Sequence, residues 1–149
     1  MVMKRAMIHE AGHAVIGMHF GFDIAGIAVI NRLPLTSVSD FDAPDRTPEQ
    51  RYVFLAAGTA SETFSFGDYD PQAMGSDQRF IYERGGGVIT DYLPDALEIL
   101  RANEGRLNRI QHQLALKWIS TRAEAQFNSD PDSYELLSRQ DVAIGCKCE

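Results

Sequence analysis

The chain has 149 residues, of which 44% are hydrophobic and 23% are charged, and these values are typical of a globular domain that can bury a core. The net charge is −7 and no cluster of lysine and arginine stands out, which argues against nucleic acid and anionic membrane surfaces as partners. Its longest apolar run, residues 24–30, is far shorter than the about 20 residues that cross a bilayer. We therefore expect a cytoplasmic protein.

The first predicted element is a helix over residues 2–19, followed by Gly21 as a glycine stop. One side of this helix is expected to be a buried stripe, while His9, Glu10 and His13 share another side. The residues of the stripe are Ala6, Met7, Ala14, Val15 and Met18. Residues 24–30 are small and β-branched, and they predict a strand whose edge is open to an extended peptide.

Residues 31–45 predict a loop, or a ragged edge strand followed by a loop. Thr47 and Gln50 then form a capping box, which predicts a helix ending near Phe66. Beyond it we expect a short helix over about 77–83, capped by Ser76, and one long helix over about 94–127. The fold class predicted is mainly α with a small β-sheet (α+β), in a single domain.

The most informative motif is the run His9-Glu10-Ala11-Gly12-His13. Two histidines four residues apart lie one above the other on a helix, so both imidazoles can reach one Zn²⁺ ion. Glu10 lies about 100° round the helix from His9, beside the open coordination position. From there it can act as the general base that takes a proton from a zinc-activated water. This spacing is typical of zinc metalloproteases, and Gly12 inside the helix indicates close packing behind the site.

A catalytic zinc of this kind needs a third protein ligand, and three residues are candidates. His19 stands where a related pattern has its third histidine, but that pattern needs a glycine at position 16, where this chain has Ile16. Glu62 lies among small residues that let a second helix approach closely, as a ligand or as a hydrogen-bond partner of one histidine. Asp77 follows a turn that leads into the start of a helix, which would fix its carboxylate firmly, and carboxylate oxygen is an accepted zinc ligand. These considerations leave Asp77 and Glu62 nearly equal.

Three segments resemble the FtsH peptidases, the zinc protease part of membrane-bound AAA proteases. Residues 9–15 reproduce the family motif H-E-A-G-H-A-V, and residues 57–63 resemble its A-G-R-A-A-E-E stretch. Residues 73–78 resemble the family's T-G-A-S-N-D-L segment, which supplies an aspartate ligand. The resemblance implies that Asp77 is the third zinc ligand and that Glu62 supports the site from close by. The chain departs from the family at Thr59 and Thr63, where the family has an arginine and a glutamate.

The resemblance extends over roughly residues 5–85, and nothing in the chain resembles a P-loop or a transmembrane anchor. We therefore expect an ATP-independent zinc metalloendopeptidase with a zincin-like helix near its N-terminus. The peptidase-like domain is assigned to residues 1–128. Residues 129–149 are expected to be a C-terminal extension, partly flexible, with Cys146 and Cys148 as reduced thiols in a mobile tail.

The expected substrate is a peptide or an unfolded protein segment, and a homo-oligomer is possible. The alternative from another class is a zinc-binding but catalytically inactive module that serves as a binding or regulatory protein. A further alternative is a metal-free structural protein in which His9 and His13 are ordinary polar helix residues.

Overall fold

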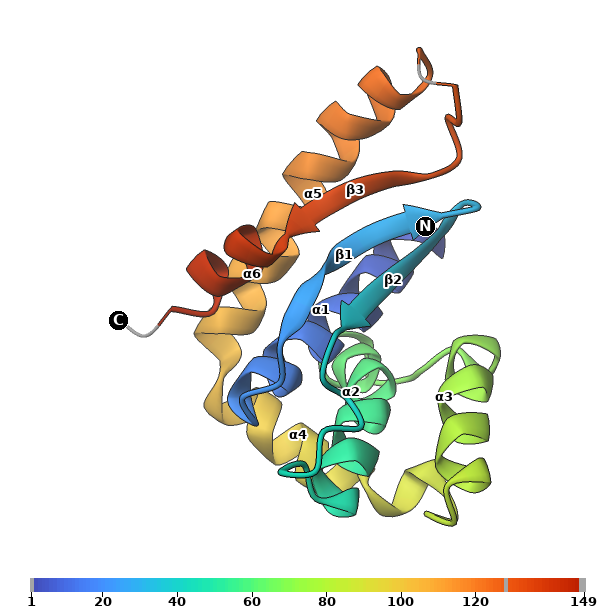
Figure 1. Ribbon diagram of the computed structural model, residues 1–149, viewed down its shortest axis with the longest axis vertical. Coiled ribbons are helices and arrows are strands. Elements are labelled where there is room, and N and C mark those ends of the chain that lie inside the picture. Colours follow the sequence, from blue (N-terminus) through green and yellow to red (C-terminus); the bar gives the residue numbers. More distant parts are fainter. Residues whose placement is uncertain (1, 128, 148–149) are drawn as a thin grey trace.

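The computed structural model describes residues 2–127 and 129–147. Over these residues the chain is mainly helical, with a three-stranded antiparallel sheet, which confirms the predicted α+β class (Figure 1). The helices are α1 (Val2–His19), α2 (Pro48–Phe66), α3 (Pro71–Glu83), the 3-10 helix η1 (Ile89–Asp91), α4 (Leu93–Ala102), α5 (Glu104–Ala125) and α6 (Arg139–Gly145). The strands are β1 (Ile24–Ile30), β2 (Leu33–Val38) and β3 (Tyr134–Ser138). No helix among the described residues is long and apolar enough to span a membrane.

Helix α1 lies at the centre of the fold, behind the sheet in Figure 1. It contacts α2 and α5 as well as strands β1 and β2. Every residue from Met7 to Gly17 is consequently buried, rather than only the single apolar stripe that the sequence predicts. The side of the helix that holds the two histidines is therefore shielded from solvent along with the rest.

The sheet has the strand order β2-β1-β3, with both neighbours antiparallel to β1. The bounds of β1 match the predicted strand, but the expectation that it offers an open edge is wrong, because β2 and β3 pair with it on both sides. A two-residue turn, Asn31 and Arg32 with φ of 50° and 71°, joins β1 to β2. The edge strand nearest the histidines is thus β2, in the segment where the sequence left open a ragged edge strand.

Helix α2 begins and ends as the sequence predicts. Thr47 and Gln50 form the capping box, and Gly67 follows Phe66 with a left-handed φ of 80°. The middle of α2 is buried against α1, and the two backbones approach closely at Gly12. A Cβ atom on Gly12 would lie 2.4 Å from Cβ of Ser61, so only glycine fits there without a shift. This confirms the close packing that Gly12 indicates.

Helix α3 begins six residues earlier than the sequence predicts. Asp70 caps it by accepting a hydrogen bond from the backbone N–H of Gln72, and Pro71 occupies its first turn. Asp77 therefore lies in the middle of α3 and not in a first turn capped by Ser76. The predicted end, Glu83, is correct.

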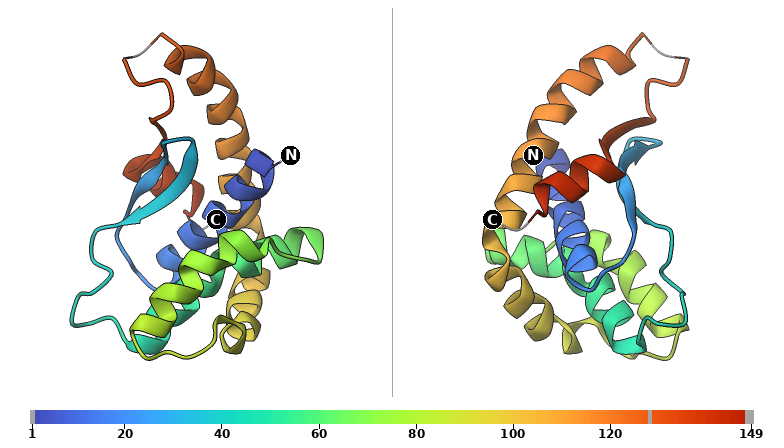
Figure 2. Two further views of the ribbon diagram at one scale, coloured as in Figure 1. Left: turned by 90° about the vertical axis from the view of Figure 1, so that its right-hand side faces the viewer. Right: turned by 60° about the vertical axis from the view of Figure 1, so that its left-hand side comes forward.

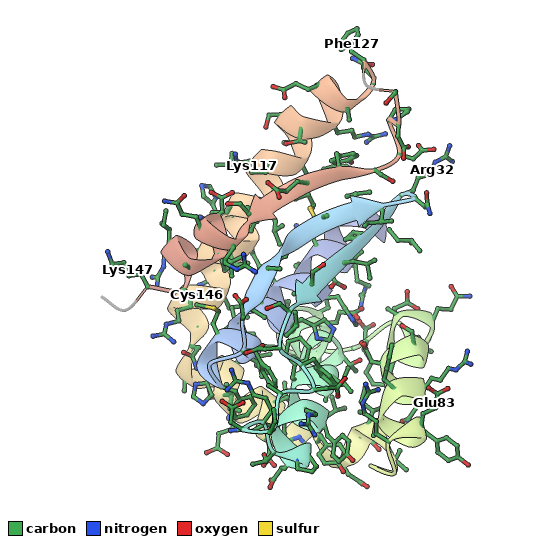
Figure 3. The ribbon with its side chains drawn as sticks, in the orientation of Figure 1. Arg32, Glu83, Lys117, Phe127, Cys146 and Lys147 are labelled. Carbon is green, nitrogen blue, oxygen red and sulfur yellow. The ribbon has the colours of Figure 1, made fainter. Side chains whose placement is uncertain are left out.

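The predicted long helix is divided into α4 and α5 at Asn103, whose backbone has φ −117° and ψ 28°. The amide of the Asn103 side chain donates to the carbonyl oxygen of Ile99, which stabilises the end of α4. Helix α5 then runs past the sheet, and both views of Figure 2 show its outer half standing clear of α1. Phe127 marks that outer end and is 85% exposed (Figure 3).

The C-terminal segment is part of the fold, in contrast to the mobile tail expected from the sequence. Strand β3 pairs with β1, and Leu137 and Val142 are fully buried in the core. Cys146, at the end of α6 in Figure 3, is also buried, with 5% of its surface exposed. Burial raises the pKa of its thiol to about 11, so the thiol stays protonated near neutral pH. Cys148 lies outside the described residues.

Candidate metal centre

The two histidines of α1 point their Nε2 atoms at each other. His9 Nε2 lies 3.1 Å from His13 Nε2, and each residue is only 5% exposed. The spacing of four residues places both rings on one face of the helix, as the sequence predicts. The pair is therefore buried at the floor of a hollow beside α1.

Asp77 meets both imidazoles, although 64 or more residues separate it from them along the chain. Its Oδ2 atom lies 3.0 Å from Nε2 of His9 and 3.3 Å from Nε2 of His13. His19, in contrast, is exposed at the end of α1 and contacts Asn103, with 3.5 Å between its Nδ1 and the Asn103 Nδ2. Of the candidate third ligands, Asp77 is the one whose carboxylate reaches both histidines.

The three atoms form a triangle with sides of 3.0, 3.1 and 3.3 Å. Tetrahedral zinc with nitrogen and oxygen ligands at about 2.0–2.1 Å separates neighbouring ligand atoms by about 3.3–3.4 Å. The triangle is therefore within a few tenths of an ångström of three corners of such a tetrahedron. The residues present fit a zinc ion.

The outer nitrogens of the two rings fix which tautomer faces the triangle. His9 Nδ1 lies 2.7 Å from Oε2 of Glu62, and His13 Nδ1 lies 2.9 Å from the carbonyl oxygen of Phe54. Both partners accept, so each Nδ1 donates its proton and each neutral ring presents a lone pair at Nε2. Two nitrogen lone pairs and a carboxylate oxygen thus converge on one point, which only a cation or protons can occupy favourably.

Glu62 supports the centre from the side away from the triangle. It is fully buried, and its Oε1 accepts hydrogen bonds from Arg5 at 3.2 Å and from the backbone N–H of Asp70 at 3.0 Å. Its other oxygen accepts from His9 and orients that ring. Because Glu62 contacts Nδ1 of His9, the ring nitrogen that faces away from the triangle, its position is that of a supporting residue and not of a ligand.

Glu10 lies beside the triangle without belonging to it. Its Oε2 atom is 4.0 Å from Nε2 of His9, and it is 9% exposed. Ligand atoms of Glu10 and the two histidines all lie within 4.8 Å of one another. A carboxylate at this distance can exchange a proton with a water molecule held at the centre.

The charged state of the metal-free centre follows from the carboxylates around it. Burial works to lower the pKa of His9, but hydrogen bonds to Asp77 and Glu62 outweigh it and raise that pKa to about 10. For Asp77, burial works to raise the pKa, but the charges and hydrogen bonds of His13 and His9 lower it to about 2. The site therefore favours positive charge strongly.

Gly58 of α2 provides the space that the His9 ring occupies. A Cβ atom at position 58 would lie 2.2 Å from Nε2 of His9, so any larger side chain displaces the imidazole. The small residues around position 58 indicate a close approach of α2. The structure shows in addition that position 58 has to be glycine because the His9 ring lies against it.

A groove with a volume of about 1220 Å³ opens over the centre, between β2, the N-terminal half of α1 and α3. The left view of Figure 2 shows α3 beside α2, to one side of the β1–β2 hairpin. The floor holds His9, Glu10, His13 and Asp77. Its exposed apolar side chains are Leu33, Leu35, Phe66 and Phe80. The volume exceeds what a single small ligand needs and suits an extended chain segment.

Two contacts of the site are not predicted by the sequence: the hydrogen bonds from Thr36 to Glu10, and the hydrogen bond from His13 to the Phe54 carbonyl. Their approach to Glu10 and His13 depends on the strand register and on helix packing, which no local pattern reports.

Models of known protein families give no match to this chain, and a search of curated proteins finds none with significant similarity.

Proposed function

We propose that the chain is a zinc-dependent metallopeptidase, similar to the FtsH peptidases, that hydrolyses peptide bonds in extended or unfolded segments. The observation that carries the proposal is the convergence of three acceptor atoms beside the carboxylate of Glu10. Two come from the buried side chains of His9 and His13, and the third comes from the half-buried Asp77. The family motif around His9 points the same way. A zincin site needs this set of groups, with one coordination position left open.

His9, His13 and Asp77 would hold the ion, and Glu62 keeps the His9 ring in its orientation. A bound zinc ion supplies the Lewis acid that activates a water molecule and polarises the scissile carbonyl. Glu10 accepts a proton from the attacking water and returns it to the leaving amine as the C–N bond breaks. The products are a carboxylic acid and an amine, and one water molecule is consumed.

The groove supports a peptide as the substrate class. It combines apolar side chains on β2, α2 and α3 with the polar floor. Extended peptides commonly place their side chains in apolar pockets of this kind.

The Glu10→Gln variant tests the proposal. Glutamine keeps the shape of the side chain but cannot accept the proton, so we expect hydrolysis of casein or a peptide library to fall by about 10²–10⁴-fold. The zinc content should stay at the wild-type level, because Glu10 is not one of the ligands.

Glu124→Gln is the matched control, since Glu124 is exposed on α5 outside the groove, and it should leave turnover unchanged. Cleavage by Glu10→Gln at the wild-type rate would contradict the role of Glu10. A zinc-loaded wild-type protein without turnover would instead support a zinc-binding module that serves as a binding or regulatory protein.

A further inference from the structure

The carboxylate of Glu10 is held by one of its two oxygens. Oε1 accepts a hydrogen bond from the backbone N–H of Thr36 and another from the Thr36 hydroxyl, each 2.8 Å long. The Thr36 hydroxyl also lies 3.1 Å from the backbone carbonyl oxygen of Glu10. The other oxygen, Oε2, is the one that faces the histidines at 4.0 Å from His9 Nε2.

The register of the hairpin explains why Thr36 is available. Thr36 stands opposite Ile27, and alternate residues of an antiparallel edge strand direct their N–H groups away from the partner strand. Two residues earlier, the same side of β2 has Pro34, which has no N–H. At this part of the edge, Thr36 is therefore the residue that supplies a backbone N–H donor, and the carboxylate of Glu10 accepts its hydrogen bond.

We propose that Thr36 is a positioning residue for the general base, and this inference rests on the proposed function. With Oε1 held by two donors, rotation of the carboxylate is restricted, and Oε2 stays directed at the centre. The alternative, a mobile glutamate with three rotatable bonds, would have to be ordered in each catalytic cycle. Strand β2 thus orients the catalytic carboxylate as well as bordering the groove.

The substitutions Thr36→Val and Thr36→Ser test the inference in the full chain. Valine keeps the branched shape and the backbone N–H but removes the hydroxyl, so we expect kcat to fall about 10- to 100-fold, as for loss of one hydrogen bond to a charged group. KM should change less than about twofold, because Thr36 acts on the carboxylate and not on substrate binding. Serine restores the hydroxyl and should return kcat to near the wild-type value.

Thr59→Val is the matched control, because the Thr59 hydroxyl is buried with no hydrogen-bond partner among the described residues. It makes the same chemical change on α2 and should leave kcat and KM unchanged. Circular dichroism establishes that each variant is folded.

A second measurement needs no turnover and no metal. In the wild-type protein the Thr36 amide proton should resonate downfield and exchange slowly, because it donates to a carboxylate. In Glu10→Ala both properties should be lost at Thr36, while the amide of Ser37, which pairs with Gly26 across the ladder, should change little. A Thr36 amide that is the same in both proteins overturns the inference.

The outcomes separate the two proposals. An active wild-type enzyme whose Thr36→Val variant keeps its kcat overturns the positioning role and leaves the peptidase intact. A zinc-loaded wild type without turnover overturns the proposed function and the catalytic role of Thr36 together, whatever the amide measurement gives.

Discussion

Asp77 supplies the third atom of the site, beside the Nε2 atoms of two imidazoles that meet edge to face. Without it, the pair of Nε2 atoms at 3.1 Å would face each other with like lone pairs in a buried space. With it, the site binds positive charge, and in the metal-free state the charge is a proton on His9, whose pKa is raised to about 10. A zinc ion would therefore compete with protons for the same lone pairs.

Zinc affinity should consequently depend on pH well above the ordinary histidine range. Because the pKa of His9 is raised, the free site keeps its proton up to about pH 10, and zinc must displace it. Because the pKa of His13 is raised as well, we expect the Kd for zinc to fall at least about tenfold for each pH unit from 6 to 8.5, with at least one proton released per ion bound. Titration against a chelator of known affinity measures this slope, and a Kd that is constant above pH 7.5 would contradict it.

Among the elements, the packing of α2 on α1 decides the geometry of the centre. Gly12 lets the two backbones approach, and Gly58 leaves room for the His9 ring. The Phe54 carbonyl and Glu62 of α2 fix the tautomers of both histidines of α1. The sequence predicts both helices, because the glycine stop and the capping box are local signals. It does not predict which face α2 presents, since that depends on contacts between residues about 50 positions apart.

Gly58→Ala tests this packing. The added Cβ would collide with the His9 ring at 2.2 Å, so we expect zinc affinity to fall at least about 10-fold, comparable to loss of an outer contact of a metal ligand. Gly75→Ala is the matched control on α3, because a Cβ there meets nothing within 4 Å. It should keep zinc affinity and raise the free energy of unfolding by about 0.5–1 kcal/mol.

Isothermal titration calorimetry measures the affinities, and urea denaturation measures the stabilities. A folded Gly58→Ala protein that binds zinc as tightly as the wild type would contradict this, because it would show that the His9 ring can accommodate a Cβ at position 58.

In the molecule as a whole, the part of the chain with the weakest local signals differs most from the sequence prediction. Residues 134–145 have no periodic pattern long enough to mark a strand or helix, yet β3 completes the sheet and α6 packs on α5. The early start of α3 has a similar origin, because Asp70-Pro71 resembles a turn as much as a cap. The histidine pair was predictable because its spacing is local, whereas the Thr36 contact arises from tertiary structure.

The zinc content of protein prepared without an affinity tag or a metal column tests the central claim most directly. Wild-type protein, Asp77→Ala and His19→Ala are each incubated with zinc, freed of excess ion and analysed by mass spectrometry of the metal. We predict one zinc ion per chain in the wild type and in His19→Ala, and almost none in Asp77→Ala. A wild-type chain that retains no zinc, or a zinc ion lost from His19→Ala and kept by Asp77→Ala, would contradict the account.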